Sequence, residues 1–358
     1  MTFLNNNKGL GESMKTNYNS LINDISKSLN SIYLLYGDEQ YLVQTAINRI
    51  KKQFGELVQG INYILIDDTN INNLISDIEM PAFGYDKKLI LVRNSGLFKK
   101  DGRRKTLTPD QEKLFNYLSQ KENVEFINEN VVIIFVEQSA DNNSLFEVIS
   151  KIGVVCEIQE LQVSELKARL KQICAMYKVG ADDSTLEYLI ERSGTNLEVL
   201  INEIRKLIEY AGENGKIDKQ SVNNLAIKQI DSVVFDLTDN LANKRIDEAL
   251  VVLDELIYQK IEILVILKTL YTHFKKLYLC ADALKTGQNI TGVLGLKPNQ
   301  IFLVNKYKNQ LRHFDEKVLR KLLDEFVELD YNYKTAKIDI DLGLRSILCT
   351  YCSANYNA

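Results

Sequence analysis

The stretch SIYLLYGDEQYLVQ, Ser31 to Gln44, joins a predicted strand to a predicted helix through a single glycine. Ile32–Tyr36 is a short apolar run rich in β-forming residues, and Gly37 ends it. Beyond the glycine, apolar residues return every three or four positions, as on one face of a helix: Leu42, Ala46, Ile47 and Ile50. A strand, a glycine and a helix form the frame of a phosphate-binding loop. The stretch therefore predicts an α/β fold and raises the question of nucleotide binding.

The residues that would bind a nucleotide are missing from this frame. In the phosphate-loop pattern G-x-x-x-x-G-K-[ST], the lysine contacts the outer phosphates and the hydroxyl contacts Mg²⁺. With Gly37 as the first glycine, the last three positions are occupied by Leu42, Val43 and Gln44. Asp38 and Glu39 place carboxylates at the helix N-terminus, where they stabilise the helix by about 0.3–1 kcal/mol each and repel phosphate. We therefore predict a degenerate phosphate loop and expect no cofactor.

The first 160 residues continue this alternation of strands and helices. Strands are predicted at Ile32–Tyr36, Ile61–Ile66, Leu89–Val92, Val131–Val136 and Val154–Ile158. Helices are predicted between them at 39–54, 70–79, 110–121 and 144–151. Apolar runs that are separated by helices are typical of a parallel sheet covered on both faces. We predict a Rossmann-like α/β domain over residues 1–160, with residues 1–13 as a disordered extension.

After Leu161 the strand pattern ends, and amphipathic helical patterns continue to the C-terminus. Ser164 is the expected N-cap of the first helix, and the next two helical segments, TLEYLIERSG and NLEVLINEIRKLIEYAG, each end in glycine. Further helices are predicted at 245–257, 259–285, 298–310, 315–336 and 339–352. The pattern predicts a small helical domain over residues 161–228 and an all-helical domain over residues 229–358.

Composition limits the classes of function open to the chain. Its 358 residues suffice for two or three domains, and 45% hydrophobic with 26% charged residues is an ordinary globular balance. A formal net charge of −4 gives no overall positive field for nucleic acid. No apolar run approaches the roughly 20 residues that cross a bilayer, and the five dispersed cysteines suit a reducing compartment. We expect a cytoplasmic protein without a membrane contact.

No catalytic or metal site is predicted elsewhere in the sequence. The fourth strand ends in Glu137 and Gln138, where a nucleotide-hydrolysing protein would have paired acids. Cys349 and Cys352 have metal-like spacing, but a zinc site needs about four ligands. The chain has two histidines and no second cysteine pair. We therefore predict no catalytic residues and no metal.

Four segments, in order along the chain, resemble markers of the delta subunit of bacterial DNA polymerase III, a clamp-loader subunit. They are YLLYGDEQYLVQTAINRI (Tyr33–Ile50), MPAFGYDKKLILVRN (Met80–Asn94), SGTNLEVLINEIRKLIEYAG (Ser193–Gly212) and SVVFDLTDNLANKRIDEALVVLDELI (Ser232–Ile257). The resemblance covers nearly the whole chain after Met14, although the basic insert at 97–110 departs from it. It implies an AAA+-type sheet in the first domain, a lid domain at 161–228 and a collar domain at 229–358.

The resemblance also implies a function without catalysis. A delta subunit grips the ring-shaped sliding clamp, the beta subunit, and opens it for loading onto primed DNA during replication, while other subunits hydrolyse ATP. The implied partners are the clamp, the tau or gamma and delta prime subunits through the collar domain, and primed DNA. The chain would thus belong to a nucleotidyltransferase holoenzyme without having a polymerase active site. Two alternatives remain open: an active AAA+ ATPase with an atypical phosphate site, and a protein-binding adaptor of the same fold.

The resemblance places the clamp-binding residues at Met80, Ala82 and Phe83, in a hydrophobic wedge before the third strand. Pro81 ends the preceding helix and Gly84 permits a tight turn, so Phe83 can project outward. A phenylalanine that fills a partner's pocket contributes roughly 1.5–3 kcal/mol by burial. The alternative is that Met80 and Phe83 close the core beneath the sheet.

A basic loop precedes the helix that is predicted to start near Pro109. Its basic residues are Lys99, Lys100, Arg103, Arg104 and Lys105. Each phosphate that such a residue neutralises adds salt-dependent affinity, so the loop is a candidate DNA contact. The alternative is a solvated surface loop, because no interleaved aromatic residue supports base stacking.

Overall fold

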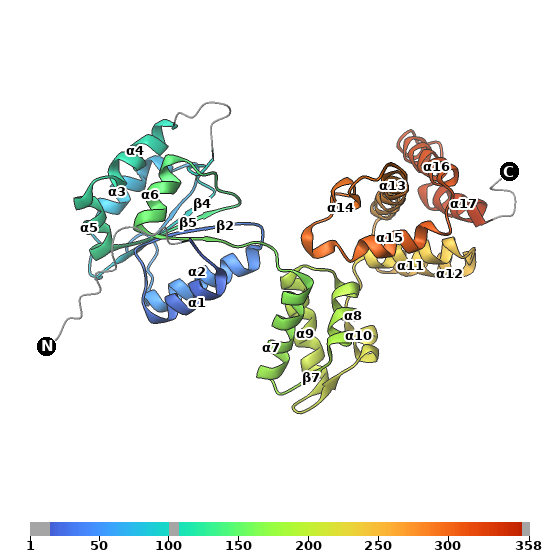
Figure 1. The fold of residues 1–358 in the computed structure, drawn as a ribbon, viewed down its shortest axis with the longest axis horizontal. Helices are drawn as coiled ribbons and strands as arrows, with labels where there is room; N and C mark the ends of the chain where they lie inside the picture. The colour runs from blue at the N-terminus through green and yellow to red at the C-terminus, as the bar shows by residue number, and fades with distance from the viewer. Residues whose placement is uncertain (1–14, 100–106, 353–358) are drawn as a thin grey trace. The chain divides into compact units, whose positions relative to one another are not determined.

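The computed structural model describes residues 15–99 and 107–352. These residues form two compact units, one that ends at Glu160 and one that begins at Leu161 (Figure 1). The predicted extension at 1–13 lies outside the described residues, as do four of the five residues of the basic loop, Lys100, Arg103, Arg104 and Lys105. The division of the second unit into a lid and a collar stays a prediction.

The first unit is built on a parallel sheet, which confirms the fold class predicted for this part of the chain. The described strands are β1 (Lys15–Thr16), β2 (Ile32–Tyr36), β3 (Tyr63–Ile66), β4 (Lys88–Arg93), β5 (Val131–Glu137) and β6 (Val154–Glu157). They lie in the order β1-β6-β2-β5-β4-β3. Tyr36 at the end of β2 pairs with Glu137 and Glu157, and Arg93 pairs with Val136. The loops that follow β2, β4 and β5 therefore begin at the same edge of the sheet.

Helices cover both faces of this sheet (Figure 1). One face carries α1 (Tyr18–Lys27) and α2 (Gln40–Phe54). The other carries η1 (Ile71–Asn73), α3 (Leu74–Glu79), α4 (Pro109–Leu118), α5 (Lys121–Asn130) and α6 (Ser144–Ile152). Ile32, Leu34 and Tyr36 belong to the core beneath the second group. Because successive strand residues point to opposite faces, the buried residues Tyr33 and Leu35 face α1 and α2.

Three elements of the first unit differ from the prediction. The short strand β1 and the helix α1 were not predicted, and α1 buries only Leu21 and Ile25. The single helix predicted at 110–121 is wrong, because α4 ends at Leu118 and α5 begins at Lys121. The start of α4 at Pro109 is as predicted, and Thr108 caps it.

Over its described residues, 161–352, the second unit is helical apart from one two-stranded ribbon. Its first part comprises α7 (Val163–Met176), β7 (Gly180–Ala181), α8 (Asp183–Ser193), α9 (Leu197–Ala211), β8 (Lys216–Ile217) and α10 (Lys219–Leu225). Gly194 and Gly212 are the C-caps of α8 and α9, as predicted. The predicted N-cap Ser164 is wrong: Gln162 caps α7, and its backbone N–H donates to the Glu165 carboxylate at 2.8 Å.

The remaining helices share one apolar core. They are α11 (Ile230–Ala242), α12 (Ile246–Tyr258), α13 (Ile263–Thr286), α14 (Ile290–Val293), η2 (Pro298–Gln300), α15 (Leu303–Leu311), α16 (Glu316–Lys334) and α17 (Ile340–Cys352). The long helix α13 packs against α11, α15, α16 and α17 and contributes the fully buried Phe274 and Leu277. Within the described ranges, no helix is long and apolar enough to span a membrane.

Candidate functional site

The predicted wedge lies in the segment between α3 and β4. Helix α3 ends at Glu79, and the Met80 N–H donates to the Ser76 carbonyl at 3.0 Å. Met80 itself has an extended backbone, with φ −64° and ψ 131°. Pro81 explains this conformation, since proline disfavours helical geometry in the residue before it. The chain therefore leaves the helix at Met80 and turns toward the sheet.

A tight turn at Ala82–Tyr85 presents Phe83 to solvent. The Tyr85 N–H donates to the Ala82 carbonyl at 2.8 Å, and Gly84 has φ +82°. That φ is typical of the third position of a type II turn, which favours glycine. Phe83 is 72% exposed and Met80 is 52% exposed, whereas Ala82 is partly buried. The alternative in which Met80 and Phe83 close the core is therefore wrong, and their contact with a clamp stays a prediction.

A buried lysine lies beneath this turn. Lys88 is the first residue of β4, and it is 2% exposed. Its ammonium group donates to the main-chain carbonyls of Asp77 and Met80. Burial lowers the pKa of Lys88 and raises the pKa of Asp77, and the attraction between the two charges partly offsets both shifts. We did not predict this role, because a lysine before an apolar run resembles a solvated strand end.

The loop between β2 and α2, which the sequence predicts to be a degenerate phosphate loop, forms backbone hydrogen bonds with β5 and with the residue after β6. The Gly37 N–H donates to the Glu137 carbonyl at 3.3 Å, and the Glu39 N–H donates to the Ile158 carbonyl at 3.1 Å. Gly37 has φ +130°, and a Cβ at this position would lie 2.3 Å from the Ile158 carbonyl oxygen. In a working phosphate loop the backbone N–H groups surround the phosphates instead. The N–H groups of Gly37 and Glu39 are thus engaged within the protein.

The three positions that would bind a nucleotide also have other roles. Leu42 and Val43 are 1% and 2% exposed and belong to the buried face of α2. The Gln44 side-chain carbonyl accepts a hydrogen bond of 2.6 Å from the Arg93 guanidinium. Arg93 thus places a positive charge beside the side chain that stands in for the Mg²⁺-binding hydroxyl, and this charge opposes a divalent cation nearby.

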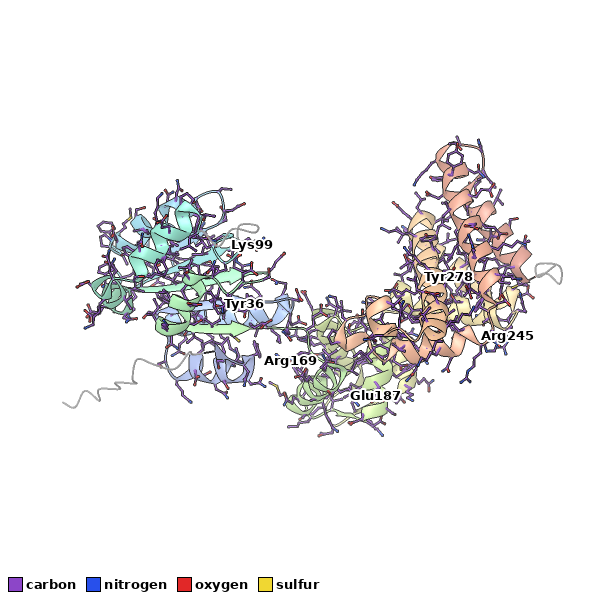
Figure 2. The ribbon with its side chains drawn as sticks, turned by 45° about the horizontal axis from the view of Figure 1, so that its top comes forward. Tyr36, Lys99, Arg169, Glu187, Arg245 and Tyr278 are labelled. Atoms are coloured by element: carbon purple, nitrogen blue, oxygen red, sulfur yellow. The ribbon has the colours of Figure 1, made fainter. Side chains whose placement is uncertain are left out.

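Glu137 holds the loop that follows β4. It is 3% exposed and accepts hydrogen bonds from the Ser95 N–H at 2.9 Å and the Ser95 hydroxyl at 2.5 Å. Burial raises the pKa of Glu137, and the bonds from Ser95 oppose this effect. Lys99, the one described residue of the candidate DNA loop, is exposed at the surface of the first unit (Figure 2). Its contact with DNA stays a prediction.

His273 and the pair Cys349 and Cys352 lie in the C-terminal helices. His273 Nε2 lies 2.8 Å from the Gln310 side-chain oxygen, and burial lowers the pKa of His273 to about 4. Cys349 is exposed and Cys352 is half-buried. Within residues 15–99 and 107–352, no three His, Cys, Asp or Glu side chains gather in a way that could hold a metal ion.

Comparisons with known proteins agree on one family. The family model for the DNA polymerase III delta subunit matches residues 33–159, and the model for its C-terminal domain matches residues 231–351. The probable DNA polymerase III subunit delta of Aquifex aeolicus is 28% identical over 312 residues, which cover 84% of this chain and 85% of the relative. The DNA polymerase III subunit delta of Bacillus subtilis is 22% identical over 346 residues, covering 94% and 98%.

A solved structure shares the fold. The Bacillus subtilis DNA clamp loader delta protein matches with a TM-score of 0.71 and 20% identity, and the match covers 94% of this chain and 99% of that one. It has the same combination of a parallel α/β sheet and a mostly helical remainder.

Proposed function

The chain belongs to the DNA polymerase III delta subunit family, and we propose on this premise that it grips the sliding clamp through Met80, Ala82 and Phe83. As a delta subunit it is a component of the clamp loader and is not itself a polymerase. The single observation behind the proposal is the exposure of Phe83 and Met80 at the end of a short helix. Large apolar side chains that face solvent together commonly mark a protein interface.

The turn suits an anchor for a partner's pocket. Phe83 stands at the tip of a hydrogen-bonded turn, and its backbone is therefore ordered before binding. Aromatic anchors in such pockets often dominate the energy of an interface. Met80 adds a flexible apolar side chain beside it, which adapts easily to an irregular surface.

Clamp opening then follows from differential binding. A subunit that binds two states of a ring can shift their equilibrium only by the difference between its two affinities. We propose that the turn binds the opened clamp more tightly than the closed one, and that nucleotide hydrolysis belongs to other subunits. The tau or gamma and delta prime subunits would bind through the C-terminal helices, with primed DNA held by the assembled loader in the cytoplasm.

The absence of intrinsic activity is also part of the proposal. Leu42 and Val43 are packed into the first unit, and Gln44 is bonded to Arg93. The side chains that would contact phosphates and Mg²⁺ are therefore replaced by groups engaged elsewhere. These features support a delta subunit over an active ATPase of the same fold.

Replacing Phe83 with alanine tests the proposal directly. We expect Phe83→Ala to weaken binding to the organism's own clamp by roughly 10- to 150-fold, which corresponds to the 1.5–3 kcal/mol of burying a phenylalanine. The melting temperature should stay nearly unchanged, because Phe83 is 72% exposed in the free chain. Calorimetry or surface plasmon resonance gives the first value and thermal unfolding gives the second.

Tyr210 on α9 offers a matched control, since it is an aromatic residue that is 67% exposed. Tyr210→Ala should bind the clamp like the unchanged chain. Equal clamp affinity for Phe83→Ala and Tyr210→Ala would contradict the proposal.

A further inference from the structure

Lys88 is unusual because it is a buried cation in a unit with an ordinary apolar core. Its side chain is 2% exposed, and lysine is almost never fully buried unless its charge is compensated. The compensation here comes from backbone oxygens and from a nearby carboxylate. The ammonium group donates to the carbonyls of Asp77 and Met80, and the Asp77 side chain adds an attractive negative charge.

The carbonyls of Asp77 and Met80 lie at the end of α3, where helix carbonyls need a donor from outside the helix. Asp77 lies in the last turn of α3 and Met80 is its C-cap, and the last carbonyls of a helix have no partner within the helix. Pro81 lies four residues after Asp77 and has no N–H, so the next turn of backbone cannot supply a donor to the Asp77 carbonyl. A cation at a helix C-terminus is also favoured by the helix dipole.

These bonds connect the exposed turn to the sheet. Two backbone hydrogen bonds nearby, from Met80 to Ser76 and from Tyr85 to Ala82, stay within residues 76–85. The bonds from Lys88 instead start on β4, the strand that lies between β3 and β5. One side chain thus connects both the end of α3 and the first residue of the wedge to an inner strand of the sheet.

We propose that Lys88 is a positioning residue for clamp binding, whose ammonium group fixes the carbonyls of Asp77 and Met80 and so orients the Met80–Phe83 turn. This inference rests on the proposed function of that turn. A surface that is ordered before association loses less conformational freedom on binding. Lys88 therefore raises affinity without contacting the clamp.

The test compares Lys88→Met with Lys87→Met in the full chain. Methionine retains an unbranched side chain of similar length and removes the ammonium group. Lys87 is the adjacent lysine, but its ammonium donates to the Asn128 carbonyl at 2.9 Å, away from the turn. We expect Lys88→Met to weaken clamp binding by about three- to tenfold, the effect of ordering one or two more groups on association. Lys87→Met should bind like the unchanged chain.

A second readout reports on the turn itself. The chain contains 18 tyrosines and no tryptophan, so Phe83→Trp introduces a single tryptophan at the tip, which can be excited selectively at wavelengths where tyrosine does not absorb. Time-resolved anisotropy of Trp in this background should show a larger fast component when Lys88→Met is added and no change when Lys87→Met is added. A loss of packing far from the turn would not move this signal.

The binding and anisotropy measurements together decide whether Lys88 positions the turn. The positioning role would be overturned if Lys88→Met bound the clamp like Lys87→Met. It would also be overturned if Lys88→Met left the anisotropy unchanged. If Lys88→Met does not fold, Lys88→Gln replaces it, because glutamine keeps a neutral donor at a shorter reach and should give an intermediate loss. Phe83→Ala is measured in parallel. Clamp binding that survives Phe83→Ala refutes the proposed function, whereas the anisotropy still decides whether Lys88 orders the turn.

Discussion

Around the turn before β4, one apolar residue is exposed and one charged residue is buried, the reverse of the usual distribution. Phe83 is 72% exposed, and Lys88 is 2% exposed. The exposure of Phe83 could be predicted from sequence, because Pro81 and Gly84 mark the end of a helix and a tight turn. The burial of Lys88 could not, because its partners are main-chain carbonyls, which no residue type identifies.

His273 allows a test of stability at the scale of one residue. Burial lowers the pKa of this histidine to about 4, so the folded state binds its proton less readily than the unfolded state. Stability is therefore complete above pH 6.5 and falls as the pH drops toward 4. The loss should reach roughly 3 kcal/mol, at about 1.4 kcal/mol per pKa unit.

Denaturant unfolding of the full chain between pH 7 and pH 4 measures this loss in the transition of the C-terminal helices. We expect His273→Gln to flatten the pH dependence in that window, because glutamine does not titrate. His313 serves as a control, and His313→Gln should keep the slope of the unchanged chain. An unchanged slope in His273→Gln would show that another group titrates there.

At the scale of elements, the sequence predicted best where apolar residues are dense. Strand β2 has the predicted bounds, Ile32–Tyr36, because all five of its residues are apolar or aromatic and are bounded by a glycine. Helix α5 was missed, since it buries only Ile127 and its remaining residues show little periodicity. The site was predicted less fully than the fold. The position of the candidate wedge rests on the resemblance and stays a prediction, and the bonds of Lys88 beneath it join side chain to main chain in a way that residue types do not reveal.

The loop between β2 and α2 leads to a prediction about nucleotides. Its Gly37 and Glu39 N–H groups are bonded to β5 and to the residue after β6, and its Gln44 is bonded to Arg93. We expect no saturable heat when the full chain is titrated with Mg·ATP at millimolar concentration. Titration of the same preparation with the clamp serves as the positive control. Tight Mg·ATP binding would instead favour the active ATPase.

At the scale of the whole molecule, the proposed contact and the core that supports it lie in one unit. The first unit has its own apolar core, to which Ile78 of α3 and Ile90 of β4 both belong. We therefore expect residues 15–160, expressed alone, to bind the clamp with nearly the affinity of the full chain. Residues 161–358 should not bind it. Circular dichroism establishes that both fragments are folded before binding is measured.

A clamp affinity that needs both fragments would contradict this expectation and would place part of the contact in the helical unit. The order of helical and α/β regions was predictable from the change in periodicity at Leu161. The partners of the C-terminal helices were not predictable from residue patterns, because the outer faces of those helices differ little from any solvated surface.

The burial of Leu42 and Val43 in α2 sets a cost in stability for building a working phosphate loop into this frame. Restoring a phosphate loop would require a glycine in place of Leu42 and a lysine in place of Val43, and both positions are nearly sealed. Emptying a leucine site of this kind costs about 2–5 kcal/mol, a large share of a typical domain's stability. A chain given these two residues would therefore have to recover that stability through other substitutions in the same unit before it could use the loop.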